Sequence, residues 1–147
     1  MNAPSKKTLV YRLFGLGKLA ETVRTELTSE GIVLWDEGIS GSVTFVNFRA
    51  PSRYSSWRRR WYTSSIVLTR TRLFGVHFTS PVINVPLADE RLRGVQISAE
   101  TPNTFAFAFD AGLFQPTWSG QITYHFRTQH AEALVAELQI RTKASVF

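Results

Sequence analysis

Most of the chain from Ile32 onward consists of short runs in which apolar and polar residues alternate, separated by Gly, Pro, Asp and Asn. A period of two places successive side chains on opposite faces of a strand. The clearest run, residues 104–110, puts Phe105, Phe107 and Phe109 on one face. No helical pattern separates the runs, so parallel βαβ units are not expected. The pattern therefore predicts an antiparallel sheet with one buried face.

A short apolar run at residues 32–35 leads into a turn, Asp36-Glu37-Gly38, before the main strands begin. We expect strands at 42–49, 66–69, 72–78, 82–87, 92–99, 104–110 and 121–127, with a loop over residues 50–56. Thr128 is then expected to cap a helix over 129–141 that has one apolar stripe. This order predicts a mainly β (β-rich α+β) fold in which about seven antiparallel strands form a barrel of two packed sheets. The C-terminal helix would close one end.

Ahead of the strands, residues 18–29 are predicted to form a helix, with Leu19, Val23 and Leu27 at four-residue spacing and Gly31 as its end. We therefore expect a helical extension, residues 1–30, packed on a domain formed by residues 31–147. The apolar segment Leu9–Leu16 is too short to span a bilayer, and no small-residue cleavage site follows it, so no secretory signal is expected.

The composition is that of one folded domain of 147 residues, with 44 % hydrophobic and 19 % charged residues. The absence of cysteine excludes disulfides, thiol catalysis and cysteine metal ligands. It also suits a reducing compartment, so we expect a cytoplasmic protein, with peripheral attachment to a membrane as the alternative.

Charge is distributed unevenly along the chain. No Asp or Glu occurs between Gly38 and Ala88, whereas that span contains seven arginines: Arg49, Arg53, Arg58, Arg59, Arg60, Arg70 and Arg72. Such a field favours anionic partners, which include acidic lipid headgroups, nucleic acid and acidic protein surfaces. The alternative is a solvated basic surface that keeps the protein soluble.

Two segments, WRRRWY at 57–62 and VLTRTRLFGV at 67–76, together with the order of seven strands and a helix, resemble the pleckstrin-homology (PH) superfold. The resemblance is closest to bacterial PH-like and GRAM-like domains and covers roughly residues 30–141. The final helix lacks the tryptophan of eukaryotic PH domains, and Thr63-Ser64-Ser65 separates the arginine cluster from the following strand. Both departures favour the bacterial branch.

The resemblance implies that loops 50–57, 79–81 and 111–120 crowd one open end of the barrel. Members that bind phosphoinositides use a basic residue at the end of strand one and a basic-x-basic pair entering strand two. On this pattern the anion-binding or headgroup-binding residues are Arg49, Arg53, Arg58 and Arg60. The residues expected to contact a partner or a membrane are Leu113, Phe114 and Trp118. Alternatively, the tryptophans pack and the arginines lie along them with solvated tips.

Catalysis has little support in the sequence. His77, His125 and His130 show no metal-binding spacing, and no nucleophile elbow occurs. We therefore expect no enzyme, no cofactor and no metal. The predicted function is a non-catalytic PH-like interaction module that mediates protein–protein contacts or self-assembly. The alternative is binding of anionic phospholipid or phosphoinositide headgroups at a membrane surface through the arginine-rich loop, and nucleic acid is not an expected partner.

Overall fold

The computed structural model describes residues 7–8 and 19–146, so the segment Leu9–Leu16 lies outside the described residues. Its strands form one sheet in the order β4-β3-β2-β1-β7-β6-β5-β8. Their bounds are β1 (Ile32–Ala50), β2 (Arg53–Thr69), β3 (Arg72–His77), β4 (Ser80–Pro86), β5 (Val95–Thr101), β6 (Thr104–Asp110), β7 (Ser119–Arg127) and β8 (Ser145–Val146). The helices are α2 (Glu21–Ser29) and α3 (Ala131–Arg141), with short 3-10 turns η1 (Glu90–Gly94) and η2 (Ala111–Leu113).

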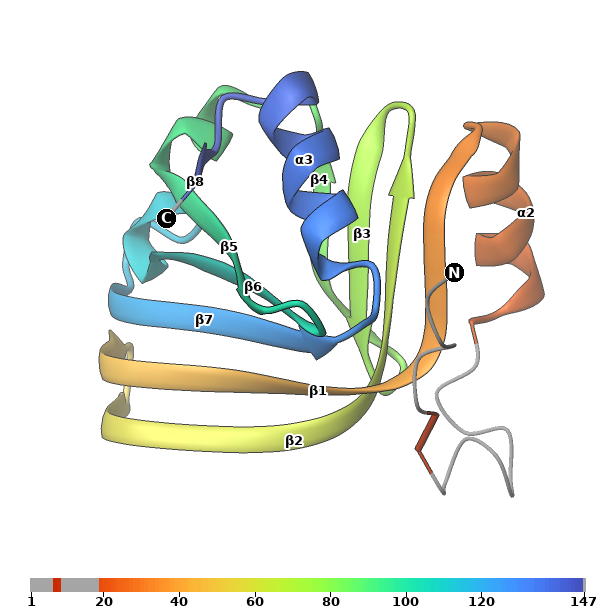
Figure 1. Cartoon of the computed structure of the whole chain (residues 1–147). Coiled ribbons are helices and arrows are strands. Elements are labelled where there is room, and N and C mark those ends of the chain that lie inside the picture. The colour runs from red at the N-terminus through yellow and green to blue at the C-terminus, as the bar shows by residue number, and fades with distance from the viewer. Residues whose placement is uncertain (1–6, 9–18, 147) are drawn as a thin grey trace.

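The predicted mainly β fold is confirmed, but the expected seven strands in two packed sheets are wrong. Figure 1 shows a single sheet that curls into a half-barrel. Strand β1 joins its two halves, because it is hydrogen-bonded to β2 on one side and to β7 on the other. An eighth strand, β8, pairs in parallel with β5, in a tail for which the sequence shows no strand signal.

The β1–β2 hairpin is much longer than the alternation predicts. Residues 36–38, expected as a turn, lie inside the 19-residue strand β1, and the expected loop at 50–56 shrinks to Pro51 and Ser52. The β1–β2 register shifts between Glu37 and Ile39, around Gly38 at φ +77°. Such a bulge inserts a residue without ending the ladder, so the strand bends and keeps its partner. Glycine adopts this backbone conformation at little cost.

The main core lies on the concave side of the curled sheet. Phe105, Phe107 and Phe109 are all buried there, as the alternation predicts. Across the half-barrel, a Cβ on Gly75 would lie 3.0 Å from Cζ of Phe126. The missing side chain at residue 75 therefore lets the Phe126 ring approach the backbone of β3, which draws the two arms of the sheet together.

Helix α3 covers the end of the concave face beside β5 and β6 (Figure 1). Its residues Ala131, Leu134 and Leu138 are buried in the main core, which confirms the apolar stripe. The helix begins at residue 131 with His130 as its N-cap, so the expected start at 129 and the expected cap are wrong. Thr128 instead donates its hydroxyl hydrogen to Asp36 Oδ2 at 2.6 Å and accepts a hydrogen bond from the His130 amide.

Helix α2 packs on the outer face of the arm formed by β1, β2 and β3 (Figure 1). A second, smaller core lies beneath it and contains the predicted Leu19, Val23 and Leu27 together with Val67, Phe74, Val76 and Trp35. The helix begins at Glu21, and Lys18 lies outside the described residues. The division of the chain into a 1–30 extension and a 31–147 domain stays a prediction.

Two adjacent buried carboxylates, Asp36 and Glu37, connect β1 to Lys7, to α2 and to the segment before α3. Asp36 accepts hydrogen bonds from Lys7 Nζ at 2.7 Å and from Thr128. Glu37 accepts from the Leu19 amide at 2.7 Å and from Arg24 Nη1 at 2.9 Å. Buried charge is tolerated only when it is paired and hydrogen-bonded, as it is here. Two of the three residues expected as a turn therefore hold other segments of the chain against β1.

The predicted strand 92–99 divides into η1 and β5, because Asp89 accepts a hydrogen bond from the Arg91 amide and starts a helical turn.

Within the described ranges, no helix has both the length and the apolar composition needed to cross a bilayer.

Replacing Leu134 with Asp should lower the free energy of unfolding by about 3 kcal/mol or more, because it buries a charge without a partner. The control is Ile140→Asp on the same helix, whose side chain is 82 % exposed and whose replacement should cost little. Urea titrations of both variants measure the difference. Equal losses would show that α3 does not bury its stripe in the core.

Candidate functional site

The first half of β2 has a strand neighbour on one side only. Residues 53–62 pair with β1, whereas pairing with β3 begins at Ser64 and ends at Leu68. Among the described residues, no strand lies along the other side of these ten. By contrast, the outer strand β4 contains Pro81 and Pro86, which discourage further pairing. Residues 53–62, which we call the open edge of β2, therefore present unpaired backbone groups.

One face of the open edge carries two exposed tryptophans. Trp57 and Trp61 are 61 % and 58 % exposed, and the Arg59 guanidinium lies between them, 5.5 Å and 6.0 Å from their ring centroids. Arg59 Nε also donates to Thr44 Oγ1 at 2.8 Å, which fixes the guanidinium over the sheet. Cation–π contacts of this kind hold an arginine in place while leaving its remaining donors available.

The opposite face of the edge carries Arg58 and Arg60. These pair across the ladder with Phe45 and Val43, residues that pack in or against the main core. Cross-strand partners point to the same side of a sheet, so both arginines project on the concave side. Alternation along a strand also separates Arg58 and Arg60 from Trp57, Arg59 and Trp61, in agreement with this register.

Arg49 and Arg53 lie at the tip of the hairpin. The Arg49 guanidinium lies 4.7 Å from the Tyr54 ring centroid, and that of Arg53 lies 5.9 Å from the Phe48 ring centroid. Arg58 lies five positions after Arg53, a distance of roughly 16 Å along a strand. The four predicted arginines thus form a row along the hairpin, and their binding of an anion stays a prediction.

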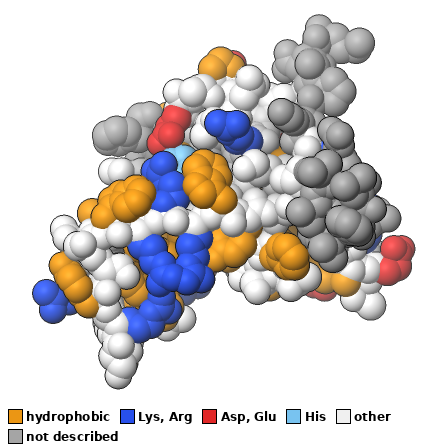
Figure 2. All heavy atoms as spheres, turned by 90° about the horizontal axis from the view of Figure 1, so that it is seen from below, with side chains coloured by type: hydrophobic (Ala, Val, Ile, Leu, Met, Phe, Trp, Pro, Cys, Tyr) orange, Lys and Arg blue, Asp and Glu red, His pale blue; other side chains and the backbone are white. Residues whose placement is uncertain are grey.

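No ion pair joins Arg49, Arg53, Arg58, Arg59 or Arg60 to an acid among the described residues. Arg72 behaves differently, since its Nη2 lies 2.8 Å from Glu26 Oε1 and its Nε donates to Glu30 Oε1 at 3.0 Å. The hydrogen bond to Glu30 raises the pKa of Arg72. Figure 2, seen from below, shows Lys and Arg side chains gathered among hydrophobic ones, with few acids near them. These five arginines of the β1–β2 hairpin therefore have no ion-pair partner among the described residues.

His77 is a buried histidine on the concave side, with both ring nitrogens in hydrogen bonds. Its Nε2 lies 3.2 Å from the Ser42 carbonyl oxygen, and its Nδ1 lies 2.8 Å from Ser64 Oγ. A carbonyl only accepts, so Nε2 carries the hydrogen and Nδ1 accepts from the serine. Burial lowers the pKa of His77 to about 4. Because Ser64 is fully buried, this serine–histidine contact is closed to a substrate and acts as a structural hydrogen bond.

The loop after β6 packs on the core while keeping part of its surface exposed. Phe114 makes an edge contact with Phe109 at 5.2 Å between ring centroids, and Trp118 makes one with Phe48 at 5.4 Å. Leu113 packs against the same cluster and would touch a Cβ placed on Gly94. All three residues are half-buried. Their predicted contact with a partner or a membrane stays a prediction.

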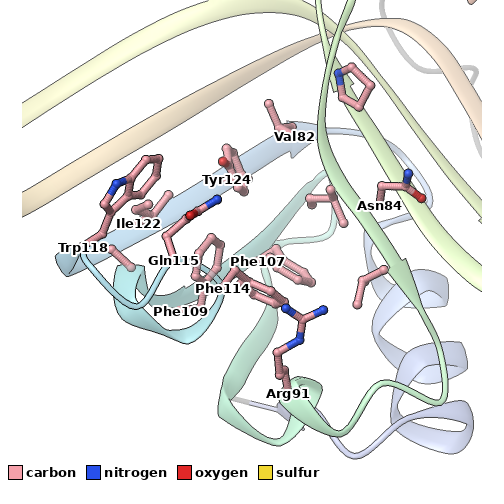
Figure 3. Close-up of a pocket in the computed structure, with 14 residues that line it drawn as sticks. Val82, Asn84, Arg91, Phe107, Phe109, Phe114, Gln115, Trp118, Ile122 and Tyr124 are labelled. Atoms are coloured by element: carbon pink, nitrogen blue, oxygen red, sulfur yellow. The ribbon is translucent and has the colours of Figure 1, made fainter. Parts of the chain in front are cut away.

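A cavity of about 370 Å³ lies between β4, β6, β7 and the loop after β6 (Figure 3). Its walls are mostly aromatic and aliphatic, with Phe107, Phe114, Trp118 and Tyr124 among them. No sequence pattern predicts this cavity. The only local signal is an unusual density of aromatic residues between positions 105 and 126, which core packing alone also explains.

Across the part of the chain that the structure describes, no group of three or more His, Cys, Asp or Glu side chains is arranged to hold a metal ion. No protein-family model matches the chain, and no curated protein matches it. Functional inference therefore rests on the geometry of the open edge and the cavity.

Between pH 7 and pH 4.5 the free energy of unfolding should fall, and His77 should account for about 2 kcal/mol of the fall. The unfolded chain takes up a proton below pH 6.5, whereas folded His77 does not until about pH 4. Urea titrations of wild type and His77→Gln at both pH values measure the difference, which should shrink in the variant. His130→Gln, at the N-cap of α3, should keep the wild-type dependence. The same fall in H77Q would exclude His77 as its source.

Proposed function

We propose that this chain is a non-catalytic PH-like interaction module that binds an acidic, extended segment of a partner protein along the open edge of β2. The observation that carries the proposal is the row of ten β2 residues, 53–62, that pair with β1 and have no described neighbour on their other side. A peptide that adds a strand there gains main-chain hydrogen bonds, and side chains on both faces supply specificity.

The PH-like assignment is supported by the order of the elements. Seven antiparallel strands, β1 to β7, follow one another along the chain and are succeeded by a helix, α3, that lies over the concave face. The arginine-rich segment falls in the second strand, as the resemblance implies. The continuous sheet and the additional β8 are departures from the expected barrel.

Charge favours an acidic partner over a second copy of the chain. In an antiparallel self-pairing centred on Arg59, Arg58 of one copy would lie opposite Arg60 of the other. Like charges directly opposite each other destabilise a strand pair. An acidic strand instead places carboxylates near arginines on both faces of the edge. This pairing is favourable because guanidinium groups bind carboxylates in bidentate geometry.

A labelled octapeptide of alternating Val and Glu should bind the wild-type protein. Arg58→Ala/Arg60→Ala should weaken binding about a hundredfold or more, since it removes two charged hydrogen bonds that contribute about 1.5 kcal/mol each. Fluorescence anisotropy at two salt concentrations measures the affinity, which should fall as salt rises.

The matched control is Arg93→Ala/Arg141→Ala, which removes the same charge from two arginines paired elsewhere, to Glu90 and Glu137. It should leave binding unchanged. A Val–Lys octapeptide of the same length and strand propensity should not bind. Equal binding of both peptides, or equal loss in both double variants, would exclude the open edge as the acidic-segment site.

The second candidate function is attachment to an anionic membrane surface. The specific observation in its favour is the exposure of Trp57 and Trp61 beside Arg59 on one face of β2. Tryptophan favours the membrane interface, and arginines near an anionic surface contribute about 1 kcal/mol each.

Vesicles with and without phosphatidylserine separate the two candidates, because membrane attachment depends on Trp57 and Trp61, whereas the acidic segment also needs the arginines on the opposite face of the strand. If the membrane is the partner, Trp57→Ala/Trp61→Ala should abolish flotation with acidic vesicles, whereas Arg58→Ala/Arg60→Ala should reduce it modestly. No flotation of wild type with acidic vesicles would exclude the membrane candidate.

A further inference from the structure

The cavity of about 370 Å³ is a consequence of the open half-barrel. Helix α3 covers the concave face at its β5 and β6 end, and the loop after β6 covers part of the remainder (Figure 1). The space left between this loop and β4 is lined by apolar side chains from Val82, Val85, Phe107, Phe109, Phe114, Trp118 and Ile122. Small-molecule sites are typically concave, mostly apolar and about 300–1,000 Å³ in volume.

The cavity has few polar lining residues, and only one of them is charged. Arg91 is its one charged lining residue, and no Asp or Glu lines it. The Arg91 guanidinium lies 4.7 Å from the Phe114 ring centroid and is held by Asp89, which accepts from Nε at 3.1 Å and from Nη2 at 2.7 Å. This arrangement fixes the guanidinium at the cavity wall and leaves Nη1 without a described partner.

Tyr124 lies on the other side of the cavity from Arg91 in Figure 3. Its hydroxyl makes no hydrogen bond with the described residues, and burial raises the pKa of Tyr124 to about 12, so the ring is neutral. Together with Val82, Tyr124 also lines a wider hollow beside His77 and Tyr62. The apolar space therefore continues beyond Tyr124, away from the charged end.

We propose that this cavity binds a medium-chain fatty acid, with the carboxylate accepting hydrogen bonds from Arg91 Nη1 and the chain lying among Phe109, Phe114 and Trp118. A water-sized group occupies about 30 Å³, so the volume accommodates roughly a dozen such groups, which corresponds to a chain of about ten to twelve carbons. An amine is disfavoured because no Asp or Glu lines the cavity to pair with it. The proposal is independent of the open edge of β2.

Calorimetric titration with dodecanoate, below its micelle concentration, tests the site. Wild type should bind with one-to-one stoichiometry, and Arg91→Gln should bind about tenfold more weakly or worse, as expected for loss of a charge-assisted hydrogen bond. The matched control is Arg93→Gln, whose arginine pairs with Glu90 outside the cavity and whose loss should change nothing. Dodecyltrimethylammonium, with the same chain and the opposite charge, should not bind the wild-type cavity.

Filling the cavity supplies a second readout. Val82→Phe, at a partly exposed wall position, should abolish dodecanoate binding while the thermal melt stays cooperative, and Val82→Leu takes its place if the larger ring prevents folding. Unchanged binding in the filled variant would overturn the proposal. Loss of binding in Trp57→Ala/Trp61→Ala would do so as well, because it would assign the signal to adsorption on the exposed face of β2. Loss in Tyr124→Phe without loss in R91Q would place the carboxylate elsewhere and overturn the Arg91 contact.

Discussion

The structure depends on one long antiparallel pairing, that of β1 with β2. The ladder runs from Ile32 to Ala50 and continues through the bulge around Gly38, so that one strand serves two parts of the fold. Before the bulge, β1 supports the arm on which α2 packs, and after it β1 joins β7 and the rest of the sheet. A bend within a hydrogen-bonded strand curls the sheet without breaking it. The core, the cavity and the open edge all follow from this curl.

The same pairing explains why the arginines of β2 are exposed. The first half of β2 extends past the end of β3, since β3 has only six residues and pairs with Ser64–Leu68. Alternation along the overhanging half then sorts its side chains onto two faces, with Trp57, Arg59 and Trp61 on one and Arg58 and Arg60 on the other. Charged residues on an edge strand discourage pairing with another copy of the same strand. They leave the edge available to a strand of opposite charge.

The acidic residues complement this distribution. Asp36 and Glu37 lie buried within β1, where they bind Lys7, Thr128, Arg24 and the Leu19 amide. Glu26 on α2 and Glu30 at its C-cap pair with Arg72, the first residue of β3. These four acids, which precede the arginine-rich span in sequence, therefore pair with groups outside residues 53–62. The arginines at the open edge of β2 have no ion-pair partner among the described residues, because these carboxylates already pair with Lys7, Arg24 and Arg72.

Local sequence patterns predict the elements whose periodicity is strong: the β-rich class, the inward Phe105, Phe107 and Phe109, the apolar stripe of α3, and the distribution of residues 57–61 over two faces. These depend on neighbouring residues, and alternation or helical spacing reports them directly. Long-range contacts instead determine that residues 36–38 continue a strand, that the sheet is single, and that a cavity remains beside Arg91. Each of these follows from contacts between distant segments, such as Asp36 with Thr128 and Gly75 with Phe126, which no local pattern records.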